Sequence, residues 1–125
     1  MVVVSLTPDL RRFVVAKIHS VPMLEALLLL RTRPRGWPVG ELAERLYLPE
    51  PKVQGLLETL QAEELAQVER GMAFYAPASA ATAELVERLA ETYSRRVVEV
   101  AELIHSGLER QARDFADAFV LRRTD

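Results

Sequence analysis

The stretch that decides the fold is Glu41 to Leu65, which reads ELAERLYLPEPKVQGLLETLQAEEL. A short amphipathic helix is predicted from Gly40 to Leu46, with apolar residues on one side and charged residues on the other. Tyr47 to Glu50 turns the chain. A second helix is predicted from Pro51 to about Ala62, because proline is favoured in a first helical turn and apolar residues recur every three or four positions. The residues expected to face the core are Val53, Leu56, Leu57 and Leu60.

A β-hairpin is expected directly after this stretch. Leu65 to Glu69 and Met72 to Ala76 read as short strands around Arg70-Gly71, where glycine permits the positive φ of a tight turn. Upstream, the proline-rich segment Arg33 to Pro38 reads as a loop. Within it, Trp37 is expected to be mostly buried on a short strand that completes the sheet of the hairpin.

Two helices are predicted before the loop. Thr7-Pro8-Asp9 has the residues that open a helix, which ends near His19. Ser20-Val21-Pro22 opens another helix that is apolar nearly all round, as is typical of a helix enclosed by others. The order of elements over residues 21–77 outlines a winged helix-turn-helix. The predicted fold is therefore mainly α with a small β-hairpin, divided into an N-terminal helix (1–20), the winged module (21–77) and C-terminal helices (78–125).

The region from Ser79 onward is rich in helix-forming residues and carries a long apolar stripe. The stripe consists of Leu85, Leu89, Tyr93, Val97, Val100 and Ile104. We expect it to pair two subunits, and the alternative is that it folds back on the core of its own chain. The capping-box spacing from Ser106 to Glu109 predicts a kink or restart, although a continuous helix is the other interpretation. A second apolar face is expected at Leu108, Ala112, Phe115, Phe119 and Val120.

Composition narrows the function classes. The 125 residues carry a net charge of −2 and are 50% apolar, which fits a single globular domain. The absence of cysteine excludes disulfides and thiolate metal sites. The first residues lack the basic and apolar regions of a signal peptide, so we expect a cytoplasmic protein.

The string Glu41 to Leu48, followed by Val53, Leu57, Leu60 and Leu65, resembles the pattern of winged-helix transcriptional regulators of the MarR-like and PadR-like families. The resemblance covers about half of the chain. It implies that Pro51 to Ala62 is a recognition helix, that Glu69 to Met72 is the wing, and that the flanking helices form a dimer. The chain departs from the pattern at Glu64, where many members of these families have glycine.

The polar face of the predicted recognition helix offers few groups that read DNA. Base-edge contacts and phosphate neutralisation need Arg, Lys, Asn or Gln. The candidates on this helix and on the nearby loop and wing are Lys52, Gln54, Gly55, Thr59, Arg31, Arg33, Arg35 and Arg70. For the loop arginines, the alternative is an ordinary solvated loop.

The sequence contains little that is typical of a catalytic or metal-binding site. Glu102 and His105 have the Glu-x-x-His spacing of helical metal sites, but no second glutamate-bearing helix is evident, and a packed or capped histidine explains His105 better. No phosphate-binding loop or nucleophile elbow occurs. We therefore expect no enzyme activity, no cofactor and no metal.

The sequence supports two functions, and a third is open without a specific signal for it. The first is a homodimeric, DNA-binding transcriptional regulator with paired recognition helices roughly 34 Å apart. The second is a winged-helix module that binds another protein, which is motivated by an acidic middle region: residues 48–77 hold two basic and five acidic side chains, whereas residues 1–47 hold seven basic and four acidic ones. A sensor of small molecules is a third class, for which the sequence offers no ligand-specific group.

Overall fold

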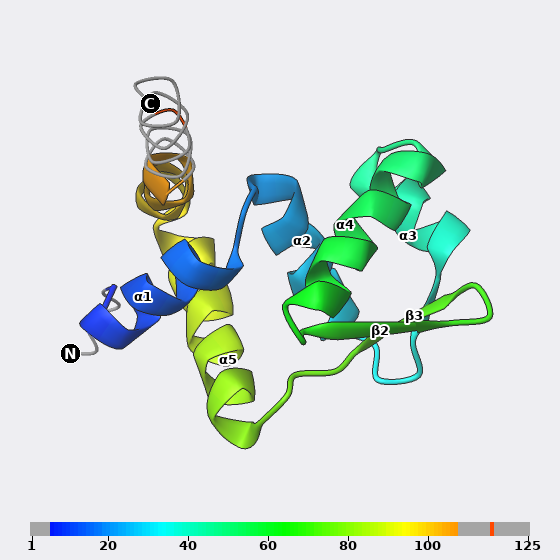
Figure 1. The fold of residues 1–125 in the computed structure, drawn as a ribbon, viewed down its shortest axis with the longest axis horizontal. Helices are drawn as coiled ribbons and strands as arrows, with labels where there is room; N and C mark the ends of the chain where they lie inside the picture. Colours follow the sequence, from blue (N-terminus) through cyan, green and yellow to red (C-terminus); the bar gives the residue numbers. More distant parts are fainter. Residues whose placement is uncertain (1–5, 108–115, 117–125) are drawn as a thin grey trace, which may run out of the picture.

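The computed structural model describes residues 6–107 and residue 116. Its helices are α1 (Pro8–Lys17), α2 (Val21–Leu30), α3 (Val39–Leu46), α4 (Glu50–Ala62) and α5 (Ala80–Arg95). Its strands are β1 (Trp37–Pro38), β2 (Ala66–Glu69) and β3 (Met72–Tyr75). Residues 97–107 are also helical. The chain is a mainly helical winged helix-turn-helix with a small antiparallel sheet, which confirms the predicted fold class (Figure 1).

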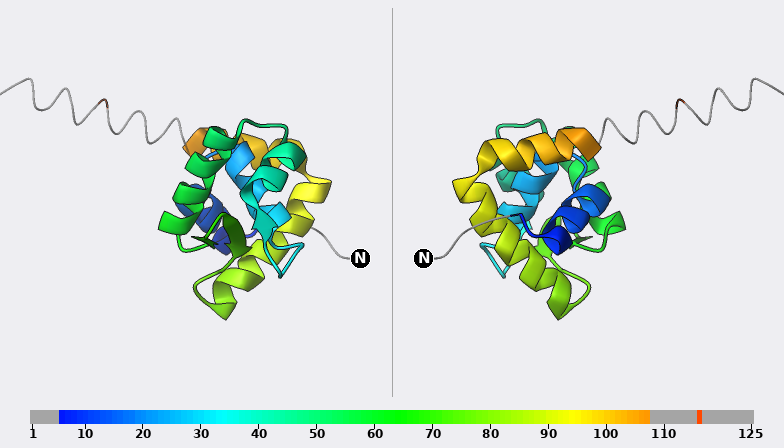
Figure 2. Two further views of the ribbon diagram at one scale, coloured as in Figure 1. Left: turned by 90° about the vertical axis from the view of Figure 1, so that its right-hand side faces the viewer. Right: turned by 90° about the vertical axis from the view of Figure 1, so that its left-hand side faces the viewer.

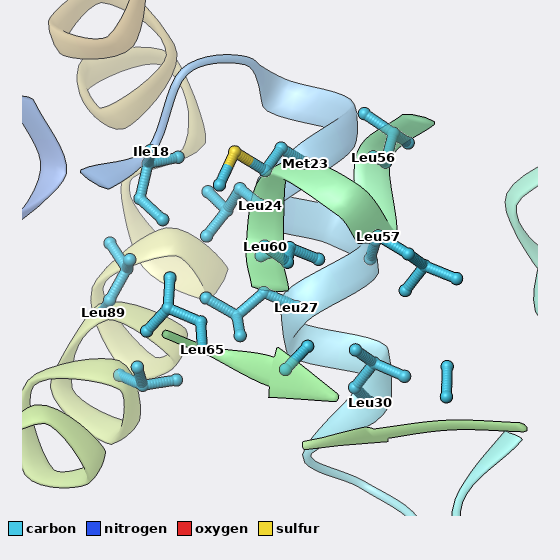
Figure 3. Packing of buried hydrophobic residues seen from close by; sticks show 14 of the residues in the cluster. Ile18, Met23, Leu24, Leu27, Leu30, Leu56, Leu57, Leu60, Leu65 and Leu89 are labelled. Atoms are coloured by element: carbon cyan, nitrogen blue, oxygen red, sulfur yellow. The ribbon is translucent and has the colours of Figure 1, made fainter. Parts of the chain in front are cut away.

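Helix α2 is the centre of the module. It begins at Ser20, whose hydroxyl accepts a hydrogen bond of 3.2 Å from the backbone N–H of Met23, as is usual for a serine that precedes a helix. It packs against α3, α4 and β3. Figure 3 shows leucines of α2 and α4 meeting Leu65 and Leu89 in one core. The prediction that this apolar helix is enclosed by others is correct.

The sheet has the order β1-β3-β2, with both pairs antiparallel. Arg70 and Gly71 form the turn between β2 and β3, and both have positive φ (51° and 77°), which matches the twist of a two-residue hairpin. Trp37 lies opposite Ala73 and is 2% exposed, and its indole N–H donates a hydrogen bond of 3.0 Å to the carbonyl of Leu29. The predicted position of Trp37 is therefore confirmed.

Glycine is required at position 36, where the loop enters the sheet. Gly36 has φ of +93°, and a Cβ placed there would lie 2.6 Å from the Phe74 ring and 3.1 Å from the Ala73 carbonyl oxygen. A side chain there would be strained by the positive φ and would have to displace the Phe74 ring. The backbone of Gly36 is thereby held close against β3.

The C-terminal helices break at a different point from the one predicted. Arg96 has φ of −135° and ψ of 54°, which interrupts the helix, whereas Ser106 and Gly107 remain helical. The segment after the break crosses over toward α1 (Figure 2), and a Cβ at Gly107 would lie 3.8 Å from Val15 Cγ1. A straight helix would carry its second half past the edge of the small domain, and the break at Arg96 returns that half to the core. The second predicted apolar face, residues 108–120, lies outside the described residues.

The predicted pairing stripe is largely internal. Leu89, Val100 and Ile104 are fully buried within the chain, whereas Val97 is 49% exposed. Leu85 and Tyr93 are half-buried against the same core. The side chains of Leu89, Val100 and Ile104 belong to the core cluster of their own chain, and pairing of two subunits through the stripe stays a prediction. For these three residues, the structure shows the alternative in which the stripe folds back.

Within the described part of the chain, no helix by itself has the length and hydropathy of a membrane span. Helices α1 and α2 reach those limits as a pair, but they meet at a bend of 106°.

Candidate nucleic-acid interface

Helix α4 has a buried face and an exposed face. Val53, Leu56, Leu57 and Leu60 point into the core, as predicted. Lys52, Gln54, Gly55 and Glu58 lie on the exposed side. Thr59 is half-buried, and its hydroxyl donates a hydrogen bond of 3.1 Å to the carbonyl of Gly55. One helix thus contributes leucines to the core and leaves a polar surface outside.

The wing lies beside this polar surface. A hollow of about 510 Å³ separates α4 from the start of α3 and the wing turn, and it is lined by Gln54, Leu57 and Gly71 among others. The backbone N–H of Val39 donates a hydrogen bond of 3.0 Å to the carbonyl of Gly71. This bond holds the turn of the hairpin against the start of α3, so the wing is short and anchored. Figure 1 shows the wing turn and the start of α4 at the same end of the molecule.

The hollow between α4 and the wing is acidic. Glu50 and Glu58 line it, and none of its lining residues is basic. A carboxylate oxygen of Glu50 lies 3.9 Å from where a Cβ would sit at Gly40, in the first turn of α3, and a negative charge there is favourable because of the helix dipole. Glu58 is exposed and has no ion pair among the described residues. The candidate cations Lys52, Arg35 and Arg70 do not line this hollow.

Residues 23–70 match the family model of the IclR helix-turn-helix domain. The matched segment begins in α2 and ends in the wing turn, so it contains both helices of the helix-turn-helix and the first wing strand. It supports a DNA-binding transcriptional regulator. The predicted winged helix-turn-helix class is confirmed, but the match is to an IclR-type domain and does not support the MarR-like or PadR-like families. Comparison with curated proteins and with solved structures gives no match.

The predicted arginines of the IclR-type domain fall into two groups. Arg31 forms two hydrogen bonds, of 2.9 and 3.1 Å, to the carboxylate of Glu87, so its guanidinium is directed to α5. Arg33 forms an ion pair of 3.0 Å with Glu41 and lies 3.7 Å above the Trp37 ring. Arg35 and Arg70 are exposed. Hydropathy patterning could not separate these groups, because the partners of Arg31 and Arg33 come from other helices.

Tyr47 is a surface residue for which we predicted no role. It directly follows α3 in the turn of the IclR-type domain, and its side chain is 93% exposed. Its φ is +56°, a conformation that favours glycine. The signal available in the sequence was an aromatic residue at the end of an amphipathic helix, in a position that we read as a plain turn.

Polar contacts attach the helices outside the IclR-type domain to the core. Arg88 on α5 forms an ion pair of 2.9 Å with Asp9 on α1, and Tyr93 donates a hydrogen bond of 3.4 Å to Glu25 on α2. The hydrogen bonds from Arg88 and from Thr7 hold the pKa of Asp9 well below its usual range. Burial raises the pKa of Tyr93, and the nearby Glu25 carboxylate adds to that shift.

Within residues 6–107 and at residue 116, no three His, Asp or Glu side chains come together as metal ligands would. Glu102 and His105, which have the Glu-x-x-His spacing, are both exposed. His19 lies against a different partner: its Nε2 is 2.6 Å from the carboxylate of Glu63, next to the end of α4. This contact links the turn between α1 and α2 to the end of the candidate recognition helix.

Proposed function

We propose that this protein is a homodimeric transcriptional regulator that binds double-stranded DNA through α4 and its wing. The observation that carries the proposal is the IclR-type domain at residues 23–70, whose second helix keeps its polar side exposed. In helix-turn-helix proteins this helix enters the major groove. The proposed protein acts in the cytoplasm, without catalysis, metal or cofactor.

The proposed roles follow from side-chain chemistry. Lys52 and Gln54 contact base edges, because a lysine and an amide can each form hydrogen bonds there. Apart from its chain neighbours and the nearby backbone of α4, nothing among the described residues lies within 4 Å of where a Cβ of Gly55 would be, so Gly55 leaves room for DNA to approach the helix backbone. Thr59 offers a hydroxyl oxygen. Phosphate contacts come from Arg35 and Arg70, and from Arg33 when it leaves Glu41.

The proposed dimer uses an apolar surface beside the break in the C-terminal helices. Val97 is 49% exposed and Val98 is 68% exposed. Leu85 and Tyr93, on α5, are half-buried and extend the stripe that leads to this surface. Two subunits joined here would present two copies of α4 to one DNA duplex. Light scattering of the wild type and of Val98→Glu measures this step: a dimer that becomes a monomer in the variant supports it, and a monomeric wild type contradicts it.

The experiment that tests DNA binding is a titration of labelled duplex DNA at several salt concentrations, followed by fluorescence anisotropy. Affinity should fall as salt rises, with a shallow slope because few cations face the DNA. Arg70→Gln, which removes a proposed phosphate contact, should reduce the slope by about one. A wild-type protein without affinity for DNA at low ionic strength would end the proposal.

Gly55→Ala separates binding from folding. Alanine is favoured over glycine inside a helix by roughly 1 kcal/mol, so this variant should be more stable to urea than the wild type. It should nevertheless bind DNA more weakly, because the added methyl group stands where the DNA approaches. Ser94→Ala, on the exposed side of α5, is the matched control with unchanged DNA affinity. Equal affinity of Gly55→Ala and the wild type would exclude close approach at this position.

The acidic hollow favours a second candidate function, which is binding of a basic protein partner on the same face. Glu58→Gln distinguishes the two functions. Loss of this carboxylate should raise DNA affinity, because it removes repulsion of phosphate. If the protein binds a basic partner in place of DNA, neither the wild type nor Glu58→Gln should have affinity for DNA.

A further inference from the structure

We infer that Tyr47 contacts the phosphate backbone of DNA, with its phenolic hydroxyl donating a hydrogen bond to a phosphate oxygen beside the groove that α4 enters. This inference rests on the proposed DNA-binding function. Tyr47 is 93% exposed, so its ring lacks the apolar burial that an aromatic side chain normally gains. Among the described residues, the other large apolar residues that are exposed are Val97 and Val98, which lie in the C-terminal helical region outside the IclR-type domain.

The backbone around Tyr47 is fixed, so the exposed ring projects from a defined position. The N–H of Tyr47 donates to the carbonyl of Glu44 at 3.2 Å, and the N–H of Leu48 donates to the carbonyl of Ala43 at 3.1 Å. These two bonds form the Schellman motif that commonly ends a helix. Glycine is the usual residue at the position with positive φ in this motif, whereas here it is tyrosine. Neither the backbone conformation nor side-chain packing accounts for a tyrosine at this position.

The location of Tyr47 indicates the phosphate backbone and not the bases. It lies three residues before Glu50, the first residue of α4. In helix-turn-helix complexes the second helix occupies the groove and the preceding part of the motif crosses the backbone.

Charge favours a neutral donor at this point. Glu44 and Glu50 are exposed on either side of Tyr47 in sequence, and Arg45 is the exposed cation next to them. Arg31 and Arg33 are paired with Glu87 and Glu41. Since Arg31 and Arg33 are paired in this way, the inference assigns part of the backbone contact to an uncharged donor, and tyrosine is among the residues that commonly provide one.

The test compares Tyr47→Phe and Tyr47→Gly with the wild type on two unrelated duplexes of about 30 base pairs, long enough for paired recognition helices. Tyr47→Phe should lower affinity about ten-fold, by the same factor on both duplexes, because a hydrogen bond to a charged oxygen is lost. The salt slope should stay unchanged, since a neutral group displaces no counterion, whereas Arg70→Gln should reduce it. Tyr47→Gly should bind at least as weakly while its melting temperature is equal to or above that of the wild type.

Tyr75→Phe is the matched control. The hydroxyl of Tyr75 is buried on β3 without a hydrogen-bond partner among the described residues, so its removal should leave DNA affinity unchanged. If the wild type binds DNA and Tyr47→Phe binds equally well, the inference is overturned and the proposed function stands. If Tyr47→Phe changes the oligomeric state in light scattering, Tyr47 contacts a second copy of the chain and the inference is overturned as well. If the wild type binds neither duplex at low salt, the proposed function fails and the inference fails with it.

Discussion

Helix α4 and the helical region 80–107 carry apolar stripes of the same kind, but their polar sides differ. The stripe of α4 is buried in the core of one chain, and so are Leu89, Val100 and Ile104 of the C-terminal stripe. The polar side of α5 is attached to the rest of the fold through Glu87 and Arg88. The polar side of α4 has no ion pair among the described residues. The fold thus uses both sides of α5, whereas it uses one side of α4 and leaves the other available.

This difference shows what an apolar stripe can and cannot predict. A stripe predicts that one side of a helix is covered, and the burial of Val53, Leu57 and Leu60 agrees with that. It does not predict whether the cover comes from the same chain or from a partner. For α5 and the segment after it, the cover of Leu89 and Ile104 comes from the same chain.

The largest effect should come from shortening a buried side chain in each region. Leu60→Ala on α4 and Ile104→Ala after α5 remove side chains that are 0% and 1% exposed. Each should lower the free energy of unfolding by about 2–5 kcal/mol, because a cavity replaces packed methyl groups. Urea denaturation by circular dichroism measures the loss. Glu102→Ala, at an exposed site in the same segment as Ile104, is the control and should cost far less.

Measuring these stability losses at several protein concentrations tests whether Ile104 is covered by its own chain or by a second subunit. If Ile104 is covered by its own chain, the loss caused by Ile104→Ala should be the same at every protein concentration. A loss that grows on dilution would mean that a second subunit covers Ile104, because dissociation then contributes to unfolding. Leu60→Ala should show no dependence on concentration in either case.

The winged module was predictable because local signals agree there. Helix starts at Ser20 and Pro51, the apolar period of α4 and the turn at Gly71 all indicate the same fold. Trp37 was placed correctly because prolines on both sides favour an extended segment that can join a sheet.

The rest of the structure depends on contacts between distant segments. The break at Arg96 has no proline or glycine beside it, and it is explained by the burial of residues after it, which no local pattern encodes. The pairing of Arg31 with Glu87 joins residues 56 positions apart, so an arginine that the sequence offered to DNA is engaged with α5. The exposure of Tyr47 likewise follows from the three-dimensional arrangement of α3 and α4.

A smaller effect is expected where α4 ends. Glu64 has φ of +60°, and the N–H groups of Glu64 and Leu65 donate to the carbonyls of Gln61 and Leu60 in a Schellman motif. Glycine is the residue usually found at this position, so Glu64→Gly should raise the free energy of unfolding by roughly 0.5–1 kcal/mol. Thermal unfolding measures the change. Glu64→Ala is the control that removes the charge without relieving the backbone; equal stability of the two variants would show that charge and not conformation matters here.

The smallest effect concerns the polar side of α5 and appears as a dependence on pH. The pKa of Asp9 is lowered in the folded protein, first by the hydrogen bond from Arg88 and then by the one from Thr7. A lowered folded-state pKa means that the ionised carboxylate stabilises the fold above the unfolded-state pKa of about 3.9, and that this contribution is lost as the pH falls below it. Unfolding by urea between pH 7 and pH 3 should therefore show a shallower loss of stability in Asp9→Asn than in the wild type.

Arg88→Met should flatten the same part of the pH profile, because Arg88 is the main cause of the shift. Adding Asp9→Asn to Arg88→Met should then change the profile little, since the two residues act as one pair. The pair is exposed, so salt should weaken its contribution. A full effect of Asp9→Asn in the Arg88→Met background would show that Asp9 is stabilised by Thr7 and the start of α1 alone, and that the polar side of α5 contributes less to the fold than its contacts indicate.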